Sequence, residues 1–217
     1  MPPSPETPSS REKILDVAEA LFARRGFAGV GIQEVADAVG LGKSSLFHHF
    51  RSKAHLYLAV LQRVLGRIEE RLAPALDATG EPPARLDACI DALVDALAEH
   101  PATARLLLRG LFEDDDFGDA ARVELRAAEE TLARILGRFD ALLREGIQAG
   151  AFRAVSAPHT IQTLVGATVY HFASGEFGDG LLGRPLFSSE AVRRRKAEVK
   201  SLLRRGLLRP TETGGST

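Results

Sequence analysis

The 217-residue sequence has few features of secreted, membrane-spanning or metal-clustered proteins. Its single cysteine, Cys89, excludes an intramolecular disulfide and a cysteine zinc cluster. No apolar run approaches the roughly 18 to 20 residues that span a bilayer, so we expect no membrane segment. The first residues, MPPSPETPSSR, lack the basic and then apolar stretches of a secretory signal. We therefore expect a soluble, cytoplasmic protein.

The sequence patterns of common enzyme classes are also missing. We find no GxSxG turn, no P-loop, no His-Glu-x-x-His motif and no dinucleotide fingerprint. The acidic run 113–116 lacks the ligand spacing of a calcium loop, so a solvated loop is favoured over a cation site there. Cys89 lies between Ala88 and Ile90 and is interpreted as a small buried hydrophobe. We predict no enzyme activity, no metal and no cofactor.

Helical periodicity runs through most of the chain. At 45% hydrophobic residues the chain can bury a real core, and apolar residues recur at three- and four-residue intervals. Neither an alternating strand pattern nor a repeat of 20 to 50 residues is evident. The fold class is therefore predicted to be all-α. We expect helices over 9–25, 31–39, 43–50, 52–72, 82–100, 102–112, 120–149, 157–173 and 189–208, with Pro74 beyond the fourth helix and a Gly-rich loop over 175–186.

The stretch from Gly31 to Lys53 carries the strongest functional signal. A short amphipathic helix is broken by Gly40-Leu41-Gly42, because glycine leaves a helix through a left-handed conformation at least cost. In the second short helix, Leu46 and Phe50 are spaced to face inward. The opposite face carries a cation, hydroxyls and imidazoles, namely Lys43, Ser44, Ser45, His48 and His49. This pattern predicts a helix-turn-helix whose second helix enters a DNA major groove.

The distribution of charge agrees with a polyanionic partner at this stretch. The net charge is only −1, and residues 64–187 carry 12 basic against 20 acidic side chains, which would repel a polyanion. From Lys43 to Arg63, basic residues outnumber acidic ones 4 to 0. Cation is therefore concentrated at the predicted recognition helix. The last stretch, 188–217, also has 8 basic against 3 acidic residues, and we interpret its run 193–196 as a mostly solvated face.

A metal site at His48 and His49 is disfavoured. Adjacent residues on a helix point about 100° apart, so neighbouring histidines rarely share one ion. These imidazoles are better interpreted as part of the exposed face of the recognition helix.

The segment Lys13 to Leu56 resembles the DNA-binding end of a TetR-family transcriptional regulator. Its sequence is KILDVAEALFARRGFAGVGIQEVADAVGLGKSSLFHHFRSKAHL, and the likeness lies in the order Ile-Leu, Leu-Phe, Gly-Phe, Val-Ala, Gly-Leu, Ser-Leu-Phe-His-His-Phe and Ser-Lys. The resemblance implies a homodimer with a three-helix, homeodomain-like helix-turn-helix domain and a larger, divergent helical ligand domain. It divides the chain into a flexible arm (1–8), the DNA-binding domain (9–51), a ligand-binding and dimerisation domain (52–208) and a flexible tail (209–217).

The resemblance also implies roles for individual residues. Lys43 is the best candidate for a guanine contact, and Lys53 matches the family's lysine that pairs with a phosphate. The full set of expected DNA-binding residues is Gln33, Lys43, Ser44, Ser45, Phe47, His48, His49 and Lys53. Phe47 stands where the family usually has a tyrosine that binds phosphate. Gly31 and Gly42 occupy positions that often carry a hydroxyl residue, so we expect weaker anchoring to the DNA backbone.

The remaining helices are expected to bind a ligand and a second copy. Their apolar stripes are broad and rich in alanine and glycine, which leaves room for a small apolar or amphipathic molecule among the helices over 52–72, 83–100, 120–149 and 157–172. Candidate residues of this pocket are Arg105, Arg109, Phe112, Thr168 and His171. The helices over 157–173 and 189–208 are expected to form the dimer interface as a four-helix bundle.

The sequence thus predicts a ligand-responsive transcriptional regulator. By likeness to the family, we expect a repressor that a small hydrophobic molecule releases from a palindromic operator in double-stranded DNA. One alternative is a helical protein-interaction module that has lost DNA binding, which Phe47 and the two glycines would permit. An all-helical enzyme is the least favoured alternative.

Overall fold

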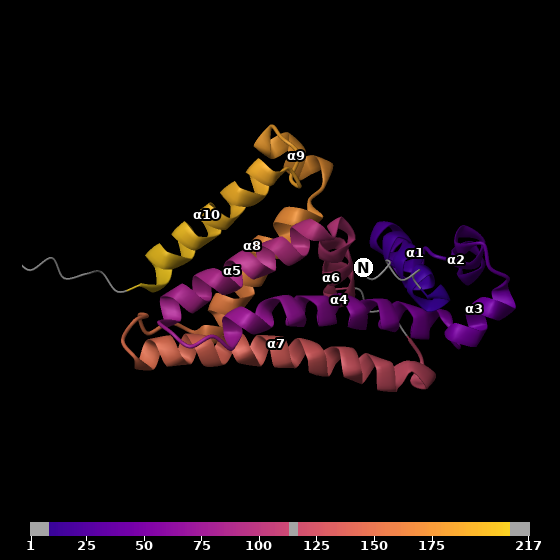
Figure 1. Cartoon of the computed structure of the whole chain (residues 1–217), viewed down its shortest axis with the longest axis horizontal. Coiled ribbons are helices and arrows are strands. Elements are labelled where there is room, and N and C mark those ends of the chain that lie inside the picture. The colour runs from indigo at the N-terminus through magenta and orange to yellow at the C-terminus, as the bar shows by residue number, and fades with distance from the viewer. Residues whose placement is uncertain (1–8, 113–116, 209–217) are drawn as a thin grey trace, which may run out of the picture. The chain divides into compact units, whose positions relative to one another are not determined.

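The computed structural model describes residues 9–112 and 117–208. Within these ranges the regular secondary structure is helical, apart from an isolated antiparallel bridge between Phe152 and Leu208, which confirms the all-α class. The expectations for 1–8, 113–116 and 209–217, and for the side chain of Phe112, lie outside what is described. The elements (Figure 1) are α1 (Ser10–Arg25), α2 (Ile32–Val39), α3 (Lys43–His49), α4 (Lys53–Leu76), α5 (Pro82–Glu99), α6 (Pro101–Phe112), the 3-10 turn η1 (Asp119–Ala121), α7 (Arg122–Gln148), α8 (Ala157–Ala173), α9 (Glu176–Leu182) and α10 (Ser189–Leu207).

The helices form two compact units. Unit 1 comprises Met1–Gly66 and Ala102–Thr131, and unit 2 comprises Arg67–Pro101 and Leu132–Thr217. The chain passes between the units three times: inside α4, after the first residue of α6 and inside α7. The units therefore divide the chain differently from the predicted boundary after residue 51, because the first half of α4 packs with the N-terminal helices. In the described part of the chain, no helix has both the length and the hydropathy needed to cross a membrane.

Unit 1 is built on α1 and the first half of α4. The predicted capping box begins α1, since the Ser9 hydroxyl accepts the Glu12 N–H at 3.2 Å and the Glu12 carboxylate accepts the Ser9 N–H at 3.0 Å. Phe22 of α1 meets Tyr57 of α4 edge-on, with ring centroids 5.0 Å apart. The Arg63 guanidinium pairs with Asp16 at 2.7 Å and Glu19 at 2.6 Å, which ties α4 to α1.

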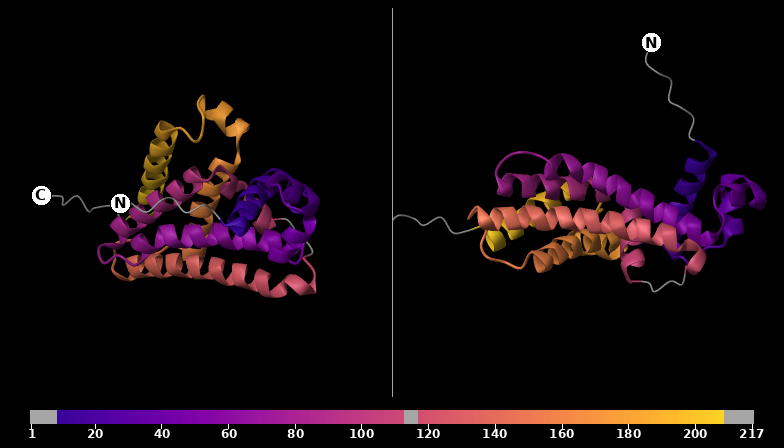
Figure 2. Two further views of the ribbon diagram at one scale, coloured as in Figure 1. Left: turned by 45° about the vertical axis from the view of Figure 1, so that its right-hand side comes forward. Right: turned by 90° about the horizontal axis from the view of Figure 1, so that it is seen from below.

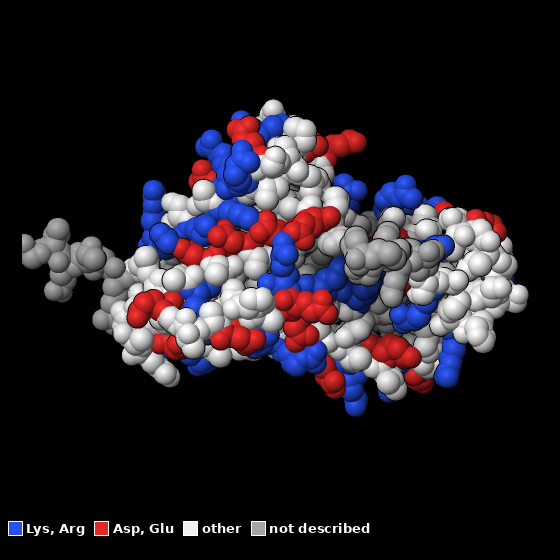
Figure 3. Space-filling model, viewed as in Figure 1, with Lys and Arg blue, Asp and Glu red and all other residues white. Residues whose placement is uncertain are grey.

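Unit 2 is built on α5, α8 and α10, which pack against one another. Helix α10 is joined to α5 by a ladder of three ion pairs at four-residue spacing. Lys196 binds Asp95 at 2.7 Å, Lys200 binds Asp91 at 2.8 Å, and Arg204 pairs with Asp87. Figure 3 shows acidic and basic side chains lying side by side over these two helices. The four-residue spacing places the basic residues on one face of α10 and the aspartates on one face of α5. Because the two helices are antiparallel, each basic residue lies opposite one aspartate.

Helices α4 and α7 run side by side in every view (Figures 1 and 2). In unit 2, Arg134 of α7 donates two hydrogen bonds of 3.1 Å to the Glu69 carboxylate of α4. The expected end of α4 near Leu72 is wrong, because the helix continues through Pro74 to Leu76. Proline lacks one backbone donor, yet the last turn closes through the Asp77 N–H, which donates to the Ala73 carbonyl at 2.8 Å.

The loop expected over 175–186 contains a short helix, α9. A Cβ at Gly178 would lie 2.2 Å from the Ser174 Oγ atom and 2.9 Å from Leu186, so a larger residue would force these side chains to move. The Asp179 carboxylate accepts a hydrogen bond from the Leu186 N–H at 2.7 Å, which holds the segment after α9 against this helix. Sequence reasoning missed α9 because its glycine content was interpreted as a loop signal.

Candidate nucleic-acid interface

The turn between α2 and α3 is the one that the glycines predict. Gly40 ends α2 with φ 75° and ψ 31°, in the left-handed region. Its N–H donates to the carbonyls of Ala36 and Asp37, and the Leu41 N–H donates to Ala36 at 2.9 Å. These bonds satisfy the carbonyls of Ala36 and Asp37 near the end of α2, and the chain changes direction directly after Gly40. Helix α3 therefore begins three residues later, and α1, α2 and α3 pack in succession.

Helix α3 has one buried and one exposed face. Leu46 has no exposed surface and Phe50 only 4%, so these two residues anchor the helix to the unit. The remaining face is solvent-exposed: Lys43, Ser44, Ser45, Phe47, His48 and His49. The first turn of α3 has no side-chain cap, because Gly42 stands at the N-cap position. The first N–H groups of α3 therefore receive no hydrogen bond from a side chain at the N-cap.

Contacts within this face leave its polar groups available. The Lys43 ammonium lies 5.8 Å from the centre of the Phe47 ring, one turn further along α3. The rings of His48 and His49 diverge, with centroids 5.8 Å apart and an interplanar angle of 73°. On α2, the Gln33 side chain is exposed and donates to Asp37 at 2.7 Å.

Lys53, in contrast, is held by its own unit. Its ammonium donates to the Phe27 carbonyl at 2.9 Å and lies 4.2 Å from the centre of the Phe27 ring. That ring also packs against Tyr57 and Phe117, with centroid distances of 5.3 and 5.0 Å. A phosphate contact by Lys53 would use its other ammonium hydrogens. Phe117 was missed from the sequence because it precedes a helix by only a few residues and carries no periodic signal.

The cations between residues 43 and 63 have unequal surroundings. Arg63 is paired with two carboxylates of α1, and Lys53 rests on a carbonyl and a ring. Lys43 and Arg51 are exposed, and no carboxylate of the described residues pairs with either. Their charge is therefore the part of this basic stretch that is free to meet a polyanion.

The residues expected to line one ligand pocket are divided between the two units. Arg105 is exposed, and Arg109 donates to the Arg24 carbonyl at 3.4 Å, both within unit 1. Thr168 belongs to unit 2 and is buried, but its hydroxyl donates to the Leu164 carbonyl of its own helix. His171 is the member that lines a described pocket.

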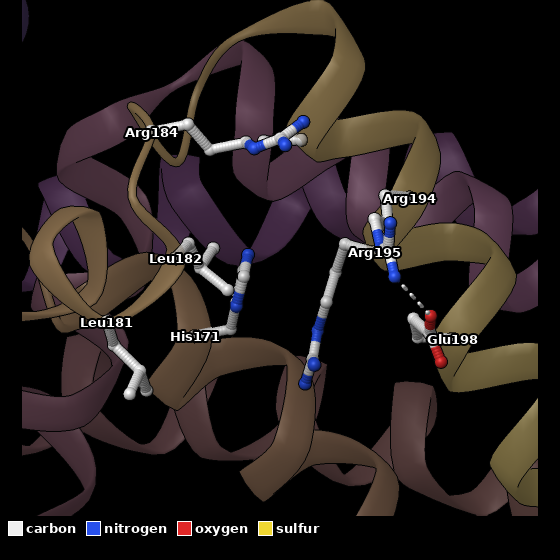
Figure 4. Close-up of a pocket in the computed structure, with 8 residues that line it drawn as sticks. His171, Leu181, Leu182, Arg184, Arg194, Arg195 and Glu198 are labelled. Carbon is white, nitrogen blue, oxygen red and sulfur yellow. Dashed lines mark ion pairs between the residues drawn. The ribbon is translucent and has the colours of Figure 1, made fainter.

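That pocket lies in unit 2, between α8, α9 and α10, and has a volume of about 330 Å³. Figure 4 shows the His171 imidazole projecting between Leu182 and Arg195, with Arg184 across the opening. Burial, with a smaller contribution from the nearby Arg195 charge, lowers the pKa of His171 to about 4, so the ring is neutral at pH 7. Burial likewise lowers the pKa of Arg195. The lining residues are His171, Leu181, Leu182, Arg184, Ala191, Arg194, Arg195 and Glu198.

Cys89 is fully buried in α5 of unit 2. Burial raises the pKa of its thiol to about 12, and this effect outweighs the opposing charges of Arg85 and Arg138. The side chain therefore stays a thiol, in agreement with its interpretation as a small hydrophobe.

Large apolar side chains are exposed on the last three helices. Tyr170 of α8 is 58% exposed and Leu202 of α10 is 63% exposed. Helix α9 and the segment after it add Phe177, Leu181, Leu182 and Phe187. Exposed apolar side chains mark a protein–protein contact where they form one contiguous patch.

Two family models match the chain. The model described as "Bacterial regulatory proteins, tetR family" matches residues 14–60. The model described as "Tetracyclin repressor-like, C-terminal domain" matches residues 82–202, more than half of the chain.

Individual relatives agree with the family models. The transcriptional activator FasR of Mycolicibacterium smegmatis is 31% identical over 147 residues, a match that spans 67% of this chain and 65% of FasR. The transcriptional repressor KstR2 of Mycobacterium tuberculosis is 28% identical over 145 residues, 67% of this chain and 70% of KstR2.

Solved structures share the fold. That of the ketosteroid transcriptional regulator KstR2 of Mycobacterium tuberculosis superposes with a TM-score of 0.73 at 23% identity, over 94% of this chain and 98% of that one. The regulator FadR of Bacillus subtilis, in complex with stearoyl-CoA, superposes with a TM-score of 0.69 at 18% identity, over 88% and 96% of the two chains.

Proposed function

The chain belongs to the TetR family of DNA-binding transcriptional regulators, and we propose that it acts as a homodimer that reads a palindromic operator through α3. The observation that carries the proposal is the division of α3 into a buried anchor, Leu46 and Phe50, and an exposed polar face. A helix anchored in this way can enter the major groove without disturbing the unit that holds it.

Each exposed side chain of α3 has a role in this proposal. Lys43 donates to the O6 and N7 atoms of a guanine. Ser44 and Ser45 bond base edges or the adjacent phosphates, and His48 and His49 follow one turn later. Gln33, Phe47 and Lys53 complete the proposed interface, with Lys53 directed to a phosphate.

The proposed dimer forms through α8 and α10. Their exposed residues Tyr170 and Leu202 would be buried against the same helices of a second copy in a twofold, four-helix arrangement. Such a dimer presents two recognition helices to successive major grooves, roughly 34 Å apart. Sedimentation that finds a stable monomer at micromolar concentration would contradict this part of the proposal.

The proposed effector is a small hydrophobic molecule, and its proposed effect is release from the operator. The names of two relatives support this class, since KstR2 is called a ketosteroid regulator and FadR was crystallised with stearoyl-CoA. Binding shifts the equilibrium only as far as the effector prefers the released conformation. Repression is proposed because it is the mode named for KstR2, while FasR is named an activator. A reporter gene behind the operator, with and without the protein, decides between them.

An electrophoretic shift with the DNA upstream of the protein's own gene tests the proposal. We expect a retarded complex with the wild-type protein and a loss of affinity of about tenfold to a hundredfold on Lys43→Ala, because a good contact to a base is worth about 1–3 kcal/mol. Arg126→Ala is the matched control, since Arg126 is an exposed cation on α7. Its affinity should stay within about twofold of the wild-type value, a change of under 1 kcal/mol.

Two results would contradict the proposed interface. If Lys43→Ala and Arg126→Ala weaken binding equally, α3 is not the reading element. If no upstream DNA binds with or without either change, the helical interaction module becomes the better description.

A further inference from the structure

We propose that the pocket between α8, α9 and α10 binds an amphipathic organic anion, with its carboxylate at His171 and Arg195 and its apolar body along Leu181 and Leu182. The regulatory consequence of this inference rests on the proposed function, whereas the binding itself does not. All residues involved belong to unit 2.

The polar end of the pocket holds two nitrogen atoms in need of a partner. The Nε2 atom of His171 and the Nε atom of Arg195 are both buried, and neither has a hydrogen-bond partner among the described residues. A buried polar atom left without a partner costs about 1–3 kcal/mol. We assign one carboxylate oxygen to each of these two donors, because the His171 tautomer can carry its proton on Nε2.

Charge selects an anion for this position. Three arginines line the pocket, and two of them already have carboxylate partners: Arg184 pairs with Glu190, and Arg194 lies 3.6 Å from Glu198. Within the described residues, Arg195 forms no ion pair, although it is partly buried, and its Nη2 donates to the Ala167 carbonyl at 2.5 Å. The nearby Glu198 charge opposes the effect of burial on the pKa of Arg195 but does not reverse it. A carboxylate in direct contact is the acceptor that a partly buried guanidinium binds most strongly.

The neutral state of His171 fits the same ligand. Because the pKa of this imidazole is about 4, the ring stays uncharged at pH 7 and adds a hydrogen bond without a second positive charge. One net cation at the polar end matches a monovalent carboxylate better than a multiply charged phosphate.

The other end of the pocket is apolar. Leu181 and Leu182 of α9 and Ala191 of α10 line it, and Leu181 is 75% exposed when nothing covers it. A volume of about 330 Å³ is at the lower end of the range for ligand pockets, about 300–1,000 Å³. The occupant is therefore a medium-length or compact amphiphile with one charged head. Since α8 and α10 are also the proposed dimer helices, its binding would act on the interface directly.

Isothermal titration of the full chain with sodium octanoate and with 1-octanol tests the inference. We expect saturable binding of octanoate at one site per chain, and at least tenfold weaker binding of the uncharged alcohol. Arg195→Gln and, independently, His171→Phe should each weaken octanoate binding at least tenfold. Arg126→Gln, an exposed arginine outside the pocket, is the control and should bind octanoate like the wild type. Thermal unfolding of every variant verifies that it is folded.

Several outcomes would overturn the inference. These are no saturable octanoate binding by the wild type, equal affinity for 1-octanol, or unchanged affinity in a folded Arg195→Gln variant. If octanoate binds only after dilution to monomers, the partner copy fills the pocket, and the inference also fails. Operator binding measured on the same samples separates the two ideas. Loss of operator binding on Lys43→Ala with no octanoate site leaves the regulator standing without this pocket.

Discussion

Helices α3 and α10 both carry basic side chains, but the surroundings of those side chains differ. On α10, Lys196, Lys200 and Arg204 are each matched by an aspartate of α5. On α3, Lys43 faces solvent, and its neighbour within reach is the Phe47 ring at 5.8 Å. Positive charge therefore has two uses in this protein. In unit 2 it joins α10 to α5, and in unit 1, on α3, it remains available to a partner.

This difference explains why a count of charges along the sequence is ambiguous. Residues 188–217 have as marked a basic excess as the stretch that contains α3. Pairing in space removes most of the excess on α10, and it also removes Arg63 from the basic stretch near α3. A nucleic-acid face is recognised by cations without carboxylate partners, which requires the packing to be known.

The largest effect is expected when α3 is given a carboxylate of its own. Phe47→Glu places an acid one helical turn after Lys43, where it pairs with the ammonium and adds a negative charge at the DNA face. Operator affinity should fall more than about a hundredfold, since a like charge across an interface costs several kcal/mol. Phe47→Gln, measured by the same titration of labelled operator, controls for loss of the ring. Equal losses in the two variants would show that charge pairing is not the cause.

The reverse experiment breaks the α5–α10 ladder. Asp91→Lys should lower the free energy of unfolding by about 1–2 kcal/mol, because one pair is lost and like charges are opposed. Urea unfolding measures this change. Adding Lys200→Asp restores the pair with reversed polarity and should recover more than half of the loss. Operator affinity should not change in either variant. A double variant as unstable as the single one would contradict the electrostatic role of the ladder.

A smaller gain is expected from adding a neutral donor to α3. Phe47→Tyr supplies the hydroxyl that the resemblance to the family places at this position, and the exposure of Phe47, 38%, leaves room for it. Operator affinity should rise about threefold to tenfold, the value of one hydrogen bond. Fluorescence anisotropy with labelled operator measures the change. No gain would place this residue away from the phosphates.

The smallest effect is expected at His171, an imidazole that burial keeps uncharged at neutral pH. Its pKa in the folded protein is about 4, below the ordinary value of 6.5, so the unfolded chain binds more protons between these pH values. Stability is therefore full above pH 6.5 and falls as the pH decreases towards 4. His171→Asn should remove about 1 kcal/mol or less of this dependence, since solvent screens a partly exposed site. Thermal unfolding across pH measures the difference, which should vanish above pH 7.

The sequence predicts most of the DNA-binding helices because their signals are local. Leu46 and Phe50 are four residues apart, so their spacing alone places them on one face, and the glycine turn before them has little conformational choice. The carbonyl that holds Lys53 belongs to Phe27, 26 residues earlier in the chain. No periodicity reports such a contact, and the same limit applies to Phe117.

The pocket between α8, α9 and α10 differs from the predicted one in the helices that line it, because its position depends on which helices meet. His171 was among the polar residues predicted to orient a ligand, but Arg195 was interpreted as part of a solvated run. In the structure it turns towards α8 and donates to the Ala167 carbonyl. Leu181 and Leu182 lie on a helix that the glycine content concealed. The predicted residues Arg105 and Arg109 belong to unit 1, whereas this pocket is lined by residues of unit 2.

Unit 1 consists of two separate stretches of chain, and this affects how its DNA-binding helices can be transferred to a related regulator. A chimaera that takes only residues 9–51 from this protein would leave Phe117 behind, although Phe117 packs on Phe27 and on Tyr57 of α4. The transplanted helices would then meet a foreign side chain at that contact. Exchange of operator specificity between relatives should therefore succeed more often when the segment before α7 travels with the reading helix.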